Sequence, residues 1–184
     1  MSATLTADER RAVLNQARRA ITDHLAGRPL TTPSAEGVFG RRAGVFVSLH
    51  RHHALRGCIG HPDGDSPLGA VLGRCAIAAA TEDPRFPPVT AAELPSLDIE
   101  VSLLTPVEPV ADPAQVEVGR HGVIIEQGWH RGLLLPQVAT EHGWDRHALL
   151  SHACLKAGLP HDAWMRGARI LRFEADVFSE SATR

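Results

Sequence analysis

Hydrophobic residues recur at helical spacing in three stretches of the chain. Each stretch carries a start signal: a Thr-x-x-Glu capping box opens the first, a Ser-Pro pair the second and an aspartate the third. A glycine lies just after the first and third stretches, as is typical at helix C-termini. The pattern predicts helices over about 7–26, 67–81 and 146–157, with Thr6, Ser66 and Asp145 as N-caps.

Other stretches show the short period of β-strands. The run from Leu97 to Leu103 alternates apolar and polar residues, and several β-branched runs are bounded by turn residues. Two segments, 28–43 and 82–89, are rich in proline or glycine and predict loops. Strands are expected over residues 43–50, 54–60 and 97–103, in a pair around Gln127-Gly128, and as one strand within 168–178.

The arrangement of these elements predicts the fold class. Strands joined by tight turns, with helices between the pairs, indicate an α+β fold in which a mainly antiparallel sheet is covered by helices. The chain has 184 residues and contains no internal repeat or low-complexity linker, which favours a single domain.

Composition narrows the class of protein. The formal net charge of −2 gives no basic footprint for nucleic acid. An odd number of cysteines, three, argues against a disulfide framework and favours a reducing compartment. The N-terminal segment has no apolar signal region, and no run approaches the roughly 20 apolar residues of a membrane helix. We therefore expect a cytoplasmic protein.

One segment, ALRGCIGH at residues 54–61, draws attention because it places a cysteine among small residues. Cys58 could be a nucleophile, a metal ligand or a small buried side chain, since free cysteine is among the most buried residue types. Strand alternation places Arg56, Cys58 and Gly60 on one face, where the guanidinium would favour a thiolate. Gly57 and Gly60 would leave room beside the sulfur for a ligand or another backbone.

Histidines surround this cysteine. His50, His52, His53 and His61 lie within a few positions of Cys58, and imidazole with thiolate would suit zinc. No CxxC or HExxH pattern is present, and an exposed histidine cluster at the tip of a hairpin explains the same residues. We therefore expect neither a metal nor another cofactor.

The segment LRGCIG also resembles the signature hexapeptide of a known family. Several further segments match that family in the same order: EDPRFPPV (82–89), LDIEVSLLTPVEPV (97–110), HGVIIEQGWHRGLLLPQVA (121–139), WD (144–145) and CLKAGL (154–159) before Trp164. The chain is therefore similar to the AMMECR domain family, also described as protein A of the AmmeMemoRadiSam system. The similarity runs over residues 9–180 and leaves residues 1–8 as an N-terminal tail.

The resemblance implies one α+β domain with a smaller subdomain and a cleft between the two. It also implies a shared pathway with MEMO-type and radical SAM proteins, without assigning a reaction. Residues that match the family pattern are the candidate site: Arg56, Gly57, Cys58, Gly60, Asp83, Arg85, Phe86, Pro136, Gln137, Cys154 and Lys156. The histidines at 50, 52, 53 and 61 are not part of that pattern.

Three functions remain open at this point. The chain could be an enzyme, or an enzyme component, that uses Cys58 with Arg56 beside it in the cleft, acting on a small molecule or peptide. It could instead be a non-catalytic partner whose glycines and prolines build a docking surface. A nucleic-acid-binding module is the third hypothesis and must explain a slightly acidic chain.

Overall fold

The structure, a computed structural model, describes residues 5–182 and contains two compact units. The first unit comprises the chain up to Leu104 together with the segment from Asp176, and the second comprises Thr105–Ala175. Both units combine helices with an antiparallel sheet, which confirms the α+β class. None of the helices in the described part of the chain is long and apolar enough to span a membrane. Of the expected tail, residues 1–4 lie outside the described residues.

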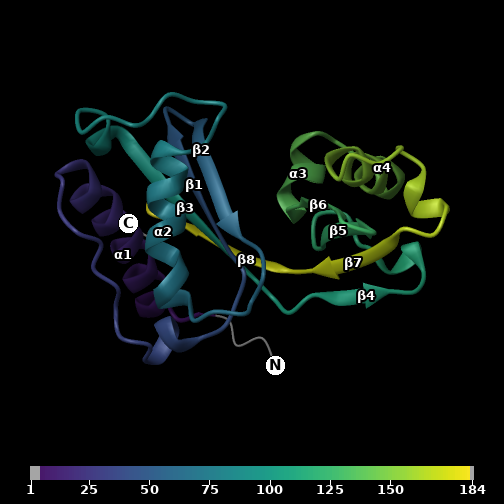
Figure 1. The fold of residues 1–184 in the computed structure, drawn as a ribbon, viewed down its shortest axis with the longest axis horizontal. Helices are drawn as coiled ribbons and strands as arrows, with labels where there is room; N and C mark the ends of the chain where they lie inside the picture. Colours follow the sequence, from purple (N-terminus) through teal and green to yellow (C-terminus); the bar gives the residue numbers. More distant parts are fainter. Residues whose placement is uncertain (1–4, 183–184) are drawn as a thin grey trace. The chain divides into compact units, whose positions relative to one another are not determined.

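The first unit is a four-stranded sheet with two helices on one face (Figure 1). The strand order is β2-β1-β3-β8, so that β2 is an edge strand. The elements of this unit are α1 (Ala7–Leu25), β1 (Val45–Arg51), β2 (Ala54–His61), α2 (Leu68–Thr81), β3 (Leu97–Leu104) and β8 (Ala175–Ser179), with short 3-10 turns at Gly37–Gly40 and Leu94–Ser96.

Strand alternation decides which side of this sheet becomes the core. Val45, Val47 and Leu49 of β1 are fully buried against the helices, as are Ile99 and Val101 of β3. Their burial removes branched apolar side chains from water, which is the main favourable contribution to folding. The intervening residues of β1 and β3 lie on the opposite face, which therefore carries the polar side chains discussed below.

Two of the three N-cap predictions fall in this unit. The Thr6 hydroxyl accepts a hydrogen bond from the Glu9 backbone, and the Glu9 carboxylate accepts one from the Thr6 N–H, so the capping box is confirmed. The expected cap at Ser66 is wrong, because Pro67 occupies the N-cap position and the helix begins at Leu68. Pro67 is held extended by a β-bridge to Arg42, which places the helix start one residue later.

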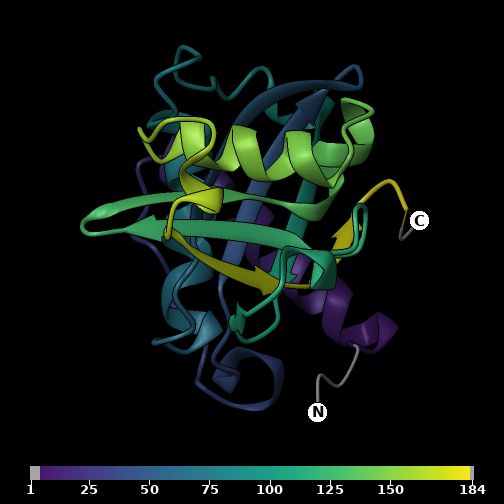
Figure 2. The same cartoon turned by 90° about the vertical axis from the view of Figure 1, so that its right-hand side faces the viewer.

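The second unit is also a four-stranded antiparallel sheet, in the order β4-β7-β5-β6. Figure 2 shows α4 running along the strands of the β5–β6 hairpin, which it contacts. Its elements are β4 (Glu108–Val110), β5 (Gly122–Gln127), β6 (His130–Leu134), α3 (Pro136–Glu141), α4 (Arg146–Lys156) and β7 (Arg169–Phe173), with 3-10 turns at Pro113–Gln115 and Ala163–Met165. The short elements α3 and β4 were not expected from the sequence pattern.

The final alternating segment is two strands instead of one. β7 belongs to the second sheet and β8 to the first, and the chain passes between the sheets at Glu174. The backbone of Glu174 bonds to Thr105, with its N–H donating to the threonine hydroxyl and its carbonyl accepting from the threonine N–H. Alternation continues through this point, so the sequence pattern alone could not reveal the change of sheet.

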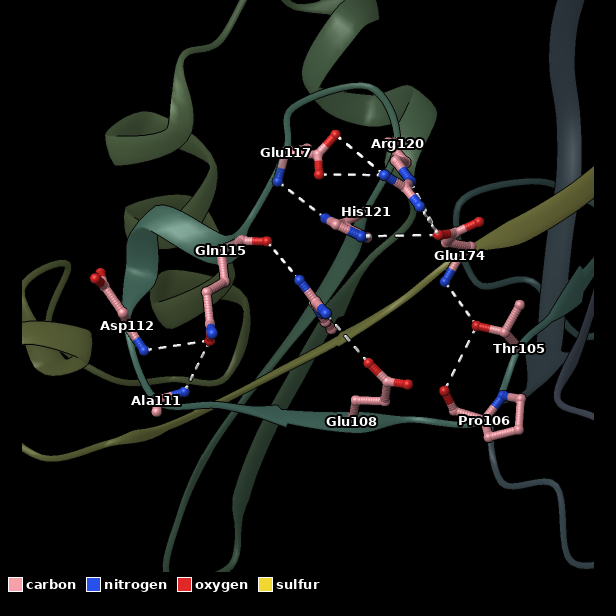
Figure 3. A network of polar contacts seen from close by, with 11 residues as sticks. Thr105, Pro106, Glu108, Ala111, Asp112, Gln115, Glu117, Arg120, His121 and Glu174 are labelled. Carbon is pink, nitrogen blue, oxygen red and sulfur yellow. Dashed lines mark hydrogen bonds and ion pairs between the residues drawn. The ribbon is translucent and has the colours of Figure 1, made fainter. Parts of the chain in front are cut away.

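A buried histidine organises one end of the second sheet (Figure 3). The Nδ1 atom of His121 accepts a hydrogen bond of 2.9 Å from the backbone N–H of Glu117. Its Nε2 lies 3.9 Å from a carboxylate oxygen of Glu174. Burial lowers the pKa of His121, and the positive charges of Arg172 and Arg120 lower it further, while Glu117 and Glu174 oppose them. The histidine is therefore held neutral, with its proton on Nε2.

This arrangement predicts a pH dependence of stability. The pKa of His121 is lower in the folded chain than in the unfolded chain. The unfolded chain therefore binds more protons as pH falls through about 6.5, and this shifts the equilibrium toward unfolding. The free energy of unfolding from urea titrations should therefore fall between pH 7.5 and pH 5.5. His121→Asn keeps an acceptor for the Glu117 N–H and should show a smaller fall. An identical pH profile in the variant would contradict this role of His121.

Candidate functional site

The outer edge of β2 is closed by a buried carboxylate from the proline-rich loop. The backbone N–H of Cys58 donates a 2.9 Å hydrogen bond to Oδ2 of Asp83. Asp83 lies two residues after the end of α2 and is only 4% exposed. An edge strand presents unpaired N–H groups, and here a side chain takes the place that a neighbouring strand would occupy. The loop is thereby fixed beside Cys58.

Arg85 neutralises this carboxylate. Its Nε and Nη2 atoms donate to the two oxygens of Asp83 at 2.9 and 2.6 Å, a bidentate geometry, and its own backbone N–H donates a third bond. These bonds hold the pKa of Asp83 well below its usual range, although burial opposes them. The Arg85 side chain is 56% exposed and lies 5.5 Å from the centre of the Phe86 ring. Its positive charge therefore faces solvent near the cysteine.

Arg56 braces the other end of the loop. Its guanidinium donates to the carbonyl oxygens of Pro87 and Pro88 at 2.8 and 3.4 Å and to the Glu93 carboxylate at 3.1 and 3.3 Å. Glu93 also pairs with Arg51. The hydrogen bonds from Arg56 and from the Thr90 N–H lower the pKa of Glu93 to about 2, although burial opposes them. The Arg56 side chain is only 14% exposed, so its geometry is that of a brace between strand and loop.

A β-bulge in β2 lies at Arg56. The pairing runs from Arg51 opposite Ala54 to His50 opposite Leu55, and then skips Arg56, so that Leu49 lies opposite Gly57. The extra residue shifts the register by one. Arg56 therefore has no residue opposite it on β1, and its guanidinium bonds to the proline-rich loop and to Glu93. The charge of Arg85 interacts with that of Cys58.

The same shift places Ser48 opposite Cys58. The Ser48 hydroxyl donates to Sγ of Cys58 at 3.2 Å, and the cysteine is half-buried while the serine is buried. Sequence reasoning missed Ser48, because a two-residue hairpin without a bulge would have placed Val47 there. It missed Glu93 as well, since only the folded loop brings that carboxylate to Arg56. A hydroxyl donor and a nearby guanidinium are groups that can stabilise a thiolate.

The two glycines of the hexapeptide make room for the protein itself. A Cβ atom on Gly57 would lie 2.0 Å from the carbonyl oxygen of Ala79 in α2. One on Gly60 would lie 2.3 Å from the ring of Phe46. The space at both positions is thus filled by a helix backbone and an aromatic ring. Gly57 permits the close packing of α2 on β2.

The remaining candidate residues belong to the second unit. Pro136 is the buried first residue of α3, and Oε1 of Gln137 is buried without a hydrogen-bond partner among the described residues. Cys154 is fully buried in α4, and burial raises the pKa of its thiol. Lys156 is exposed at the end of the same helix. Of these residues, Cys154 is part of the hydrophobic core of the second unit.

The histidines near Cys58 do not form a metal-binding group with it in the described part of the chain. His52 and His53 form the exposed turn of the β1–β2 hairpin, and Nε2 of His61 lies 2.8 Å from the Asp65 carboxylate. Within residues 5–182, no three histidine, cysteine or acidic side chains are grouped so that they could hold a metal ion.

Comparison with known proteins places the chain in a family. A family model described as AMMECR1 matches residues 14–178. Proteins of Methanothermobacter thermautotrophicus and Methanocaldococcus jannaschii are 50% and 47% identical, over 97% and 98% of this chain and 97% and 94% of theirs. The crystal structure of an uncharacterized protein from Pyrococcus horikoshii is 39% identical, with a TM-score of 0.91 over 98% of this chain and 95% of that one.

The packing at Gly57 can be tested by adding one methyl group. Gly57→Ala forces a Cβ against the Ala79 carbonyl, so α2 must move away from β2. We expect the free energy of unfolding to fall by about 1–3 kcal/mol in urea titrations, as for other overpacked sites. Gly64→Ala is the matched control, because its nearest neighbour would lie at an ordinary 3.5 Å. Equal stability of the two variants would show that the approach at Gly57 is not constrained.

Proposed function

The chain belongs to the AMMECR1 family, and from that premise we propose that it acts in the cytoplasm as a thiol-dependent enzyme component, with Cys58 as the nucleophile. The thiolate would attack an electrophilic carbon of a small molecule or peptide. Sulfur supplies the electron pair of the new S–C bond, and the leaving group departs with its own bonding pair. The partners in this pathway would be MEMO-type and radical SAM proteins.

The observation that carries this proposal is the hydrogen bond from Ser48 to Sγ of Cys58. A hydroxyl donor stabilises the charged sulfur more than the neutral thiol. Arg85 adds a positive charge beside the sulfur. The same guanidinium also forms an ion pair with Asp83. Arg56 is engaged with the proline loop and is assigned a positioning role, since it fixes the loop that carries Asp83 and Arg85.

The other two cysteines provide an internal reference for reactivity. Cys75 lies in α2 and is buried, and burial raises the pKa of its thiol to about 11. Cys154 is fully buried, and its pKa is also raised. None of the three cysteines, all of which lie within the described residues, forms a disulfide. Selective reaction at Cys58 can therefore be measured in the intact chain.

Iodoacetamide alkylation at pH 7.5, followed site by site with mass spectrometry, tests the proposal. Cys58 should be modified about tenfold or more faster than Cys75 and Cys154, since thiolate content and exposure set the rate. Ser48→Ala should slow modification of Cys58 several-fold because it removes the donor to sulfur.

Ser102→Ala is the control for this experiment. Ser102 is buried on the same face of the sheet, two residues beyond Glu100, and its hydroxyl has no hydrogen-bond partner among the described residues. Its removal should leave the rate at Cys58 unchanged. The proposal fails if Cys58 reacts as slowly as the two buried cysteines in the folded chain, or if the two serine variants behave alike.

A second function, docking without catalysis, is favoured by different observations. The spaces at Gly57 and Gly60 are filled by protein, and Arg56 and Glu93 hold a rigid proline loop on the surface. In this case capture of a MEMO-type or radical SAM protein should survive Cys58→Ser and be lost in Arg56→Gln. Turnover that depends on Cys58 would instead support the first function.

A further inference from the structure

The guanidinium of Arg85 has a second pair of N–H groups that faces solvent. Its Nε and Nη2 atoms donate to the two oxygens of Asp83 and so use one fork of the guanidinium. A guanidinium has five N–H bonds, so two on Nη1 and one on Nη2 remain. No described residue accepts a hydrogen bond from Nη1, and the side chain is 56% exposed. A ligand can therefore reach the second fork, which Nη1 and Nη2 form.

Several contacts hold this second fork in one orientation. The backbone N–H of Arg85 donates to Oδ1 of Asp83 at 3.0 Å, in addition to the two side-chain bonds. The centre of the Phe86 ring lies 5.5 Å from the guanidinium carbon, within the range of a cation–π contact. Asp83 is itself fixed by burial and by the N–H of Cys58. The free donors are thus preorganised, which lowers the cost of ordering them when a ligand binds.

The second fork lies beside the cysteine of the proposed enzyme. The Nη2 atom of Arg85 and the backbone nitrogen of Cys58 bond the same oxygen of Asp83, at 2.6 and 2.9 Å. The two nitrogen atoms therefore cannot lie farther apart than these two distances combined. The charges of Arg85 and Cys58 also interact. A small molecule held by the fork would lie next to the residue that carries the thiol.

The chemistry of the fork favours a carboxylate. Two parallel N–H groups of a guanidinium match the two oxygens of a carboxylate, and both bonds are charge-assisted. The negative charge of Asp83 is buried, and both of its oxygens already accept hydrogen bonds. Glu82 is an exposed acidic neighbour in the chain, where solvent and salt screen its charge. A neutral ligand would not gain the charge-assisted bonds.

The charge balance around the loop favours an anion with a single charge. Arg85 is already paired with Asp83. Arg51 and Arg56 both pair with Glu93, so their charges are compensated as well. A dianion such as phosphate would need a further positive charge. A monocarboxylate needs only the fork.

We propose that the second fork of Arg85 binds the carboxylate of the substrate and thereby places an electrophilic carbon against Sγ of Cys58. The substrate class is a small monocarboxylate whose electrophilic carbon lies close to the carboxylate. This binding role rests on the proposed function, because it needs Cys58 as the nucleophile.

Two alkylating reagents of similar size test the binding role. Iodoacetate carries a carboxylate and iodoacetamide a neutral amide. With both, sulfur forms a bond to the CH₂ carbon and iodide leaves with the electron pair of the C–I bond. The quantity to measure is the rate ratio at Cys58, iodoacetate over iodoacetamide, at pH 7.5 by mass spectrometry. The ratio should be about tenfold higher in the folded chain than in the urea-unfolded chain, since a positive site concentrates an anion.

A substitution of the arginine and a matched control locate the effect. Arg85→Gln should reduce the ratio to that of the unfolded chain. Arg74→Gln removes an exposed positive charge from α2 and should keep the wild-type ratio.

A double variant serves if Arg85→Gln folds poorly. Asp83→Asn with Arg85→Gln removes both charges of the ion pair and leaves the net charge unchanged. The asparagine keeps an oxygen acceptor for the Cys58 N–H. The double variant should also give the ratio of the unfolded chain.

A folded-chain ratio no higher than the unfolded one overturns this role of Arg85. A wild-type ratio in either Arg85 variant, or a reduced ratio in Arg74→Gln, overturns it as well. The proposed function survives these outcomes if iodoacetamide still modifies Cys58 faster than Cys75 and Cys154. Slow modification of Cys58 by iodoacetamide instead defeats the proposed function and the binding role together.

Discussion

The arrangement around Cys58 depends on how the open edge of the first sheet is closed. β2 has a neighbouring strand on one side only, and its outward N–H at Cys58 needs an acceptor in a place shielded from water. The buried carboxylate of Asp83 supplies the acceptor, and the fork of Arg85 compensates its charge. Strand, loop and cysteine are thereby fixed together.

This constraint separates the roles of the two arginines near the hexapeptide. Arg56, as the bulge residue, points along the loop and bonds its carbonyl groups and Glu93. Arg85 closes onto Asp83 and keeps an exposed face beside the sulfur. The bulge also brings Ser48 opposite Cys58. A polar row thus crosses the outward face of the sheet from Cys58 through Ser48 to Glu100.

Much of this fold follows from sequence patterning, because the first helix, the hairpin and β3 have strong periodicity and clear end signals. The predicted helix over about 7–26 corresponds to α1, and the strand predicted from Leu97 corresponds to β3. Features that depend on distant partners were not predictable in this way. The bulge at Arg56 shows no signal in its own residue type, and β7 and β8 alternate continuously although they join different sheets. The cysteine was therefore found, while Ser48 and Glu93 were not.

Hydrogen exchange at the backbone amide of Cys58 tests the closure of this edge most directly. The bond to Asp83 predicts slow exchange in the wild type, although β2 is an edge strand. In Asp83→Ala this amide should exchange about a hundredfold faster, while the amide of Val47 in the middle of the sheet stays protected. Fast exchange at Cys58 in the wild type, or no change in the variant, would contradict the account.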